Sequence, residues 1–389
     1  MKKIHRFLGT LTITALLLSS CKKDDPTPNS NLKYSIPSNY IFVDGSNKST
    51  IDIKGQKYRI AMIDQISSEM SDSIADNPDD LLKMLNGTMF NNNADSLNNS
   101  SFNLIDKTAN VDFFKSVFEM SAKATSSKLK ASVGVAGYYD DNGKKRYFNE
   151  NGLEPSQLFK KGIMGACLMN QVLNHHLNTS FLDAGTNKTN NNNRVLVSGE
   201  NYTTMEHLWD EAYGYIFGGD INDPVSPDYN YWSEYIHIVN TDIYFNTIKK
   251  DIIDAFIKGR AAITNKDYTT RDAQIAIIQK SLSKVSAVRG VFYLTNEGKS
   301  ALIVDGGIGA FHPLSEGYGF IWSLKYSYNP ETKSPYFTEN EIDVILADLM
   351  KGKNGFYDVD YLNANLNTIA EKIATRFGFT IDQAFINVD

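Results

Sequence analysis

Two ten-residue stretches of the chain match each other without a gap. Residues 207–216 read HLWDEAYGYI and residues 312–321 read HPLSEGYGFI, with the same histidine, glutamate, tyrosine, glycine and isoleucine at an offset of 105 residues. The match includes a histidine, of which the chain has only 6. Self-similarity at a fixed offset indicates a repeated structural unit. We therefore expect a duplicated helical unit, with one copy in each half of the chain.

The histidine and the glutamate of each copy are four residues apart. On a helix this spacing puts His207 beside Glu211 and His312 beside Glu316, each pair on one face. An imidazole and a carboxylate in that position can share a divalent metal, or hydrogen-bond to each other. Two interpretations stay open: a buried ion pair that fixes helix packing, and a ligand or metal site.

The two copies differ in ways that favour the first as the functional one. Asp210 adjoins Glu211 in the first copy, whereas a serine takes its place in the second. The candidate metal ligands are therefore His207, Asp210 and Glu211, with His312 and Glu316 as their repeat counterparts.

The helix starts of the two copies also differ. Thr203 and Glu206 have the spacing of a capping box, which predicts that His207 lies in the first helical turn. Pro313 is typical of a first helical position, which would leave His312 as the cap residue.

Apolar side chains recur at helical spacing through most of the chain. The pattern predicts helices over 154–173, 235–259, 271–294, 342–349 and 362–377. Short strand-like patterns with a polar turn predict hairpins at 40–57 and 133–148. The asparagine-rich residues 185–199 predict an exposed loop, and residues 218–228 a connection between two halves. Gly214 and Gly319 would be costly within a helix, which indicates that another backbone approaches closely.

The predicted fold is mainly α. We expect two related, duplicated helical bundles with small β-hairpins near the N-terminus and between helices. The predicted organisation is a signal peptide over 1–20, a lipid-anchored tether over 21–39, a first helical half over 40–220 and a second over 221–389.

The N-terminus has the pattern of a bacterial lipoprotein signal. Three basic residues within the first six precede an apolar run that ends at Leu18-Ser19-Ser20-Cys21, and this run is too short to span a bilayer. The tetrad resembles a lipobox, in which Cys21 receives diacylglycerol; a buried N-terminal helix with an incidental cysteine is the alternative. The acidic residues just after Cys21 resemble the surface-export signal of Bacteroidota lipoproteins. We expect a protein anchored by lipid, palmitate included, to the outer membrane and exposed at the surface.

Composition excludes some classes of function. The chain has 389 residues with 39 Lys and Arg against 45 Asp and Glu, a net charge of −6 that becomes more negative once the basic signal is removed. No basic patch suits nucleic acid. The 2 cysteines cannot form a disulfide framework, and Cys167 lies in an apolar helical pattern typical of a core residue.

Motifs of known catalysis are absent from the sequence. It contains no nucleophilic triad, no glycine-rich phosphate loop and no His-Glu-x-x-His motif, so no catalytic residue is assigned. Three other histidines, His175, His176 and His237, are further possible ligands, with an exposed histidine at a helix end as the alternative interpretation of each.

The chain resembles a family of Bacteroidota lipoproteins catalogued as domain of unknown function 4856, from about Tyr40 to the C-terminus. The resemblance is carried by residues 205–207, 209–215, 258–262, 271–272, 311–312, 314–321 and 335–338. The family name supplies no activity.

A more distant similarity is to the imelysin-like proteins. Their hallmark is Gly-x-His-x-x-Glu; here Met205 replaces the glycine, Asp210 stands at the acid position and Glu211 follows one residue later. The resemblance implies an envelope lipoprotein of two helical bundles, an association with iron uptake and a metal role for these residues. For some relatives it also implies peptidase activity.

Three functions follow as hypotheses. The first is a ligand-binding envelope lipoprotein, with a divalent metal or an iron-containing compound near His207, Asp210 and Glu211. The second is a metal-dependent hydrolase or peptidase that uses Glu211 as base. The third is a structural partner protein of an outer-membrane uptake complex. The membrane, reached through the lipid, and a small ligand or an outer-membrane protein are the expected partners.

Overall fold

The computed structural model describes residues 33–71, 77–90, 95–218 and 230–385. The predicted signal peptide, Cys21 and most of the tether lie outside the described residues, as does most of the predicted connection over 218–228. The chain divides into Met1–Ser35 and Ile36–Asp389, and all helices and strands described below belong to the second unit. The predicted boundary near residue 220 falls in the undescribed part, so the division into two halves stays a prediction.

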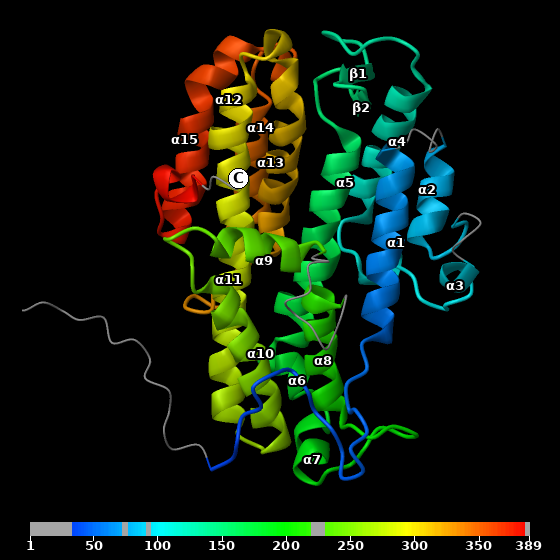
Figure 1. Ribbon diagram of the computed structural model, residues 1–389, viewed down its shortest axis with the longest axis vertical. Coiled ribbons are helices and arrows are strands. Elements are labelled where there is room, and N and C mark those ends of the chain that lie inside the picture. Colours follow the sequence, from blue (N-terminus) through cyan, green and yellow to red (C-terminus); the bar gives the residue numbers. More distant parts are fainter. Residues whose placement is uncertain (1–32, 72–76, 91–94, 219–229, 386–389) are drawn as a thin grey trace, which may run out of the picture. The chain divides into compact units, whose positions relative to one another are not determined.

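The described chain is mainly helical, as the sequence predicts (Figure 1). In chain order the α-helices are α1 (Lys54–Ser71), α2 (Pro78–Leu85), α3 (Asp95–Asn98), α4 (Val111–Ser126), α5 (Pro155–Ile163), α6 (Thr179–Leu182), α7 (Asn187–Asn192), α8 (Thr204–Phe217), α9 (Trp232–Asn240), α10 (Ile248–Thr264), α11 (Tyr268–Phe292), α12 (Lys299–Ala301), α13 (Phe311–Ser323), α14 (Glu339–Leu349) and α15 (Val359–Phe377). Shorter 3₁₀ segments are η1 (Ile105–Lys107), η5 (Asp305–Ala310), η6 (Leu324–Tyr326), η7 (Gly355–Tyr357) and η8 (Ile381–Ala384).

Two long helices contain π-helical turns. Helix α5 continues without a break through η2 (Met164–Met169) and η3 (Gln171–His176), and α11 continues through η4 (Tyr293–Gly298) into α12. Helix α13 packs against α5, α11 and η4, whereas α8 packs against η3, α10 and α1. Each copy of the repeated motif therefore lies against a π-helical turn of a long helix, a feature that is frequent at functional sites.

One of the two predicted hairpins is present as a strand pair. Strands β1 (Gly137–Asp141) and β2 (Lys144–Phe148) are antiparallel, with Gly137 opposite Phe148. The other, over 40–57, is reduced to a single bridge between Val43 and Ser49, because α1 already begins at Lys54.

Three further expectations were wrong. The helix predicted over 235–259 is broken between α9 and α10, where the Asp242 side chain accepts a hydrogen bond from the Tyr244 amide and Ile243 is 76% exposed. The asparagine-rich loop contains helix α7, where Asn191 is buried and donates to the Ile263 carbonyl. His312 is not a cap residue, because α13 already begins at Phe311.

Other expectations are confirmed. Cys167 is fully buried, and burial raises the pKa of its thiol to about 11. The capping box of Thr203 and Glu206 begins α8. No helix in the described ranges is long and apolar enough to cross a membrane.

Candidate functional site

The first copy of the motif is on α8, whose capping box places His207 in its first turn. His207 Nε2 lies 3.9 Å from Glu211 Oε2, so the predicted pair does face one point. Gln56, from α1, donates from Nε2 to the other carboxylate oxygen of Glu211 at 2.9 Å. The ring of Tyr202 stacks on the His207 imidazole, with centroids 4.8 Å apart.

A second imidazole, that of His176, lies beside the same glutamate; the sequence indicated it only as one of three further possible ligands. His176 comes from η3, and its Nδ1 lies 3.7 Å from the same Glu211 Oε2. The alternative interpretation, an exposed helix end, is wrong for this residue, because His176 is only 3% exposed. Neither of its ring nitrogens, nor Nδ1 of His207, has a hydrogen-bond partner among the described residues. Burial lowers the pKa of His176 to about 4, although the Glu211 carboxylate opposes that shift. His176 is thus neutral at pH 7.

The second copy has the same spacing but a different environment. His312 Nε2 lies 3.9 Å from Glu316 Oε2, the same separation as in the first copy. Here Lys161 of α5 lies 2.8 Å from the Glu316 carboxylate, and its ammonium also donates to the Tyr235 hydroxyl. Lys161 and Glu316 are both buried. Burial by itself would raise the pKa of Glu316, but the Lys161 ammonium outweighs it and holds the pKa at about 2.

One nitrogen of the His312 ring has two close partners. Its Nδ1 lies 2.6 Å from Glu154 Oε2, and the Arg146 guanidinium is 2.9 Å from the same nitrogen. The carboxylate only accepts and the guanidinium only donates, so the two contacts favour opposite protonation states of Nδ1. Arg146 itself forms an ion pair with Asp141 at 2.7 Å.

The two copies are therefore chemically unequal. In the second, a buried cation and a carboxylate satisfy the pair from within the chain. In the first, the neutral amide of Gln56 takes the place of the Lys161 ammonium, and two imidazoles have unpartnered nitrogens. The side chains of His207 and Glu211 are 30% and 20% exposed, against 26% and 10% for His312 and Glu316. The copies thus differ mainly in their partners, because only the first has imidazole nitrogens without a partner among the described residues.

Asp210 does not join His207 and Glu211. It is fully buried, and its Oδ1 accepts from Arg260 Nε at 2.9 Å and from the Tyr40 hydroxyl at 2.5 Å. Arg260 also contacts Glu206 at 3.0 Å. Burial raises the pKa of Asp210 to about 6, against the attraction of Arg260. The predicted trio is thus split between two faces of α8.

The donor types of the first copy suit a metal, but their arrangement does not. Neutral imidazole and carboxylate are common ligands of divalent ions. Within the residues that the structure describes, no three His, Cys, Asp or Glu side chains are placed so that they could hold a metal ion. The three donors of the first copy are thus not a bare-ion site as they stand.

A family model described as Domain of unknown function (DUF4856) matches residues 37–380. The chain belongs to this family. No curated protein and no solved structure matches it. The DUF4856 match includes both copies of the motif and all the residues that contact them.

Proposed function

We propose that this DUF4856 protein is a ligand-binding lipoprotein of the cell envelope, and that its ligand contacts His176, His207 and Glu211. One observation carries the proposal. His176 is buried against a carboxylate, with both of its ring nitrogens lacking a partner in the described chain.

Such an imidazole costs free energy in the absence of a ligand. Each buried polar atom without a partner costs about 1–3 kcal/mol, which is why most buried polar atoms have one. A ligand that reaches His176 and Glu211 removes this cost on binding. The ligand is accordingly a small polar molecule or an iron-containing compound, which brings donors and acceptors of its own to these three side chains.

Anchorage belongs to the same proposal. Cys21 would carry the lipid, and the tether over residues 21–39 would hold the helical unit at the outer membrane, on the cell surface. The membrane, reached through this lipid, and an outer-membrane uptake protein are the proposed partners.

The alternative functions apply to different features. A packing role is favoured for the second copy, because Lys161 and Glu316 join α5 to α13 through a buried ion pair. A metal-dependent hydrolase would use Glu211 as base, and it predicts turnover of a substrate, which binding alone does not.

The proposal is tested by measuring how much ligand stays bound to the purified mature protein. Native mass spectrometry and elemental analysis are applied to the wild type and to His176→Phe and Glu211→Gln. His175→Gln serves as the matched control, because His175 is the neighbouring histidine but is exposed. We expect one ligand per chain in the wild type and the control, and none in the other two variants, all four with native circular dichroism.

Equal ligand content in all four proteins would contradict the proposal. So would a wild type that carries nothing and whose melting temperature is unchanged by an extract of small molecules from its own cells.

A further inference from the structure

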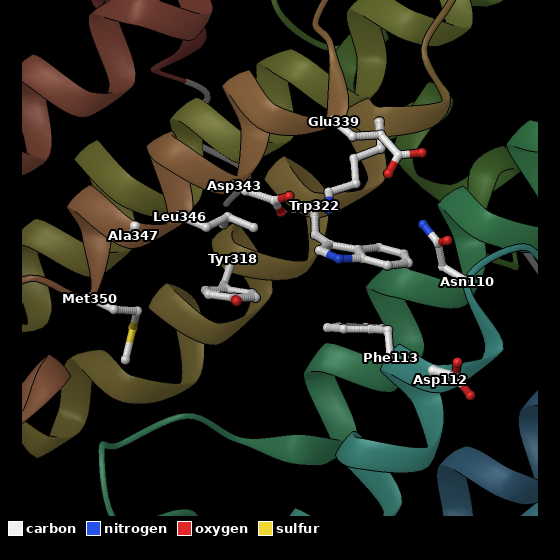
Figure 2. Close-up of a pocket in the computed structure, with 11 residues that line it drawn as sticks. Asn110, Asp112, Phe113, Tyr318, Trp322, Glu339, Asp343, Leu346, Ala347 and Met350 are labelled. Carbon is white, nitrogen blue, oxygen red and sulfur yellow. Dashed lines mark ion pairs between the residues drawn. The ribbon is translucent and has the colours of Figure 1, made fainter.

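A pocket of about 590 Å³ lies between the start of α4, helix α13 and helix α14 (Figure 2). Tyr318 of the second copy of the motif lines it, whereas no residue of the first copy does. Its volume is in the range of small-molecule sites.

About half of the pocket wall is aromatic or apolar. Figure 2 shows the rings of Phe113 and Trp322 lying parallel, and their centroids are 4.0 Å apart. Tyr318, Leu346 and Met350 continue the lining along α13 and α14. Burial raises the pKa of Tyr318 to about 12, so its hydroxyl keeps its proton. These walls suit the hydrocarbon body of a ligand.

The charged groups of the pocket do not cancel. Lys325 and Asp343 neutralise each other, with Nζ 2.5 Å from Oδ1. The remaining charged lining residues, Asp112 and Glu339, are both acidic. Asp112 is exposed and pairs with Lys115 at 2.8 Å. Glu339 is also exposed, and it forms no ion pair with any residue that the structure describes. The lining therefore keeps one unpaired acidic group, Glu339, at the solvent-facing side of the pocket.

The polar groups are also mostly acceptors. Asn110 donates through Nδ2 to the Tyr326 hydroxyl, which leaves its Oδ1 free to accept from a ligand. Like the carboxylates of Asp112 and Glu339, this oxygen accepts hydrogen bonds, which an ammonium group donates. Lys325 shows that an ammonium is tolerated beside the indole, since its Nζ lies 5.6 Å from the Trp322 ring centroid.

We infer that this pocket binds a small organic cation: a primary amine on an aromatic or aliphatic body. The ammonium lies near Asn110, Asp112 and Glu339, and the body packs against Trp322 and Tyr318. The site is separate from the first copy of the motif and does not depend on the function proposed for it.

The test measures binding of three isosteric probes and one sugar to the full mature chain. The probes are 2-phenylethylamine, its neutral analogue 2-phenylethanol and the anionic 3-phenylpropionate, with glucose as the fourth ligand. Tryptophan fluorescence reports on the site, because Trp322 lines the pocket while Trp209 and Trp232 are fully buried elsewhere. We expect the amine to bind with a dissociation constant of about 1 mM or tighter, and the alcohol about five-fold more weakly or worse.

Variants of the two acidic lining residues test whether their charges hold the amine. Replacing both acids in Asp112→Asn/Glu339→Gln should weaken amine binding about five-fold or more without changing binding of the alcohol. Glu119→Gln is the matched control, since it removes an exposed carboxylate of α4 outside the pocket, and it should bind the amine as the wild type does. Trp322→Phe should abolish the fluorescence change.

Three results would overturn the inference. The first is that the amine shows no saturable binding up to about 10 mM. The second is that the alcohol, the anion or glucose binds as tightly as the amine or more tightly, and the third is that the fluorescence change survives Trp322→Phe.

Discussion

His176 shows how burial changes the chemistry of one side chain. In the unfolded chain its pKa is near the ordinary 6.5, whereas in the folded protein burial lowers it to about 4. Between these two values the unfolded state binds more protons than the folded state. The free energy of unfolding therefore rises with pH across this window, and this contribution is lost as the pH falls from 6.5 towards 4.

The substitution His176→Phe tests this assignment. The variant lacks the titrating group, so its stability relative to the wild type should increase as the pH falls from 7 to 4.5, by up to about 3 kcal/mol. Urea unfolding at several pH values measures the difference, and Asp210 cancels in it because both proteins contain that group. A difference that does not change with pH would show that His176 is solvated.

Lys161, the partner of Glu316, and Gln56, the partner of Glu211, allow a second prediction at the residue scale. Lys161→Met leaves the buried carboxylate of Glu316 without its cation and should cost about 3–5 kcal/mol of stability. Gln56→Met removes only a neutral hydrogen bond to the partly exposed Glu211 and should cost about 1 kcal/mol. Chemical denaturation of both variants provides the comparison.

The double variant Lys161→Met/Glu316→Gln is the control, because it removes both charges together. It should recover most of the stability lost in Lys161→Met. Similar losses for the two single variants would contradict the unequal roles of the two copies.

The sequence could predict part of this site. The spacing of four residues was sufficient to pair His207 with Glu211, because such pairs depend only on local helix geometry. It could not place Asp210, whose position is decided by Arg260 and Tyr40, 50 and 170 residues away along the chain. It also could not show that His176 is buried, because the apolar pattern of the helix does not reveal which other elements cover its end.

At the scale of elements, glycines set the distance between helices. A Cβ added at Gly319 on α13 would lie 2.5 Å from Lys161 Cβ, and one at Gly214 on α8 would lie 2.8 Å from Ile53 Cβ. A close approach is present at both positions, but a backbone atom, the Gln157 carbonyl oxygen at 3.3 Å, is among the nearest atoms only at Gly319. Each glycine brings its helix against the element that supplies the partner of the neighbouring glutamate.

Gly319→Ala should therefore force α13 away from α5. We expect a loss of about 1–3 kcal/mol, since overpacking at a tight helix contact outweighs the gain in helix propensity. Gly290→Ala on α11 is the matched control: its added Cβ would lie 3.3 Å from Ile321 Cγ1, a much milder overlap than at Gly319, so its stability should stay within about 1 kcal/mol of the wild type. Thermal unfolding measures the stability of both variants. Equal losses of stability in the two would contradict a specific role for Gly319.

Most elements could be predicted from periodicity, and the failures have physical reasons. Helix α15 follows its apolar pattern because one face is buried along its whole length. The pattern over 235–259 did not reveal the break after α9, because the turn depends on local hydrogen bonds of Asp242. Helix α7 forms despite its asparagines, because tertiary contacts of Asn191 hold it.

For the whole molecule, anchorage is the feature that the described residues leave to experiment. Cys21→Ser should move the protein from the membrane fraction to the soluble fraction and abolish its labelling by palmitate. Cys167→Ala is the control: it removes the buried thiol, which no lipid reaches, and should leave the protein in the membrane fraction. A Cys21→Ser protein that still sediments with membranes would contradict the lipobox interpretation.

Whether the chain arose by duplication also belongs to this scale. Both copies of the motif lie on helices that face a π-helical turn, and both keep the same distance of 3.9 Å between histidine and glutamate. The duplication inferred from the matching stretches nevertheless stays a prediction, because no repeat of the whole bundle is established.

The central claim is that His176 is a buried, neutral imidazole available to a ligand. Nitrogen-15 spectra of the histidine rings measure this directly, in the protein as purified and after its ligand has been removed by unfolding and refolding. The account predicts that His176 in the ligand-free protein stays neutral down to about pH 5, and that its ring nitrogen shifts differ between the two preparations. A His176 that titrates near pH 6.5, or identical spectra in both preparations, would contradict it.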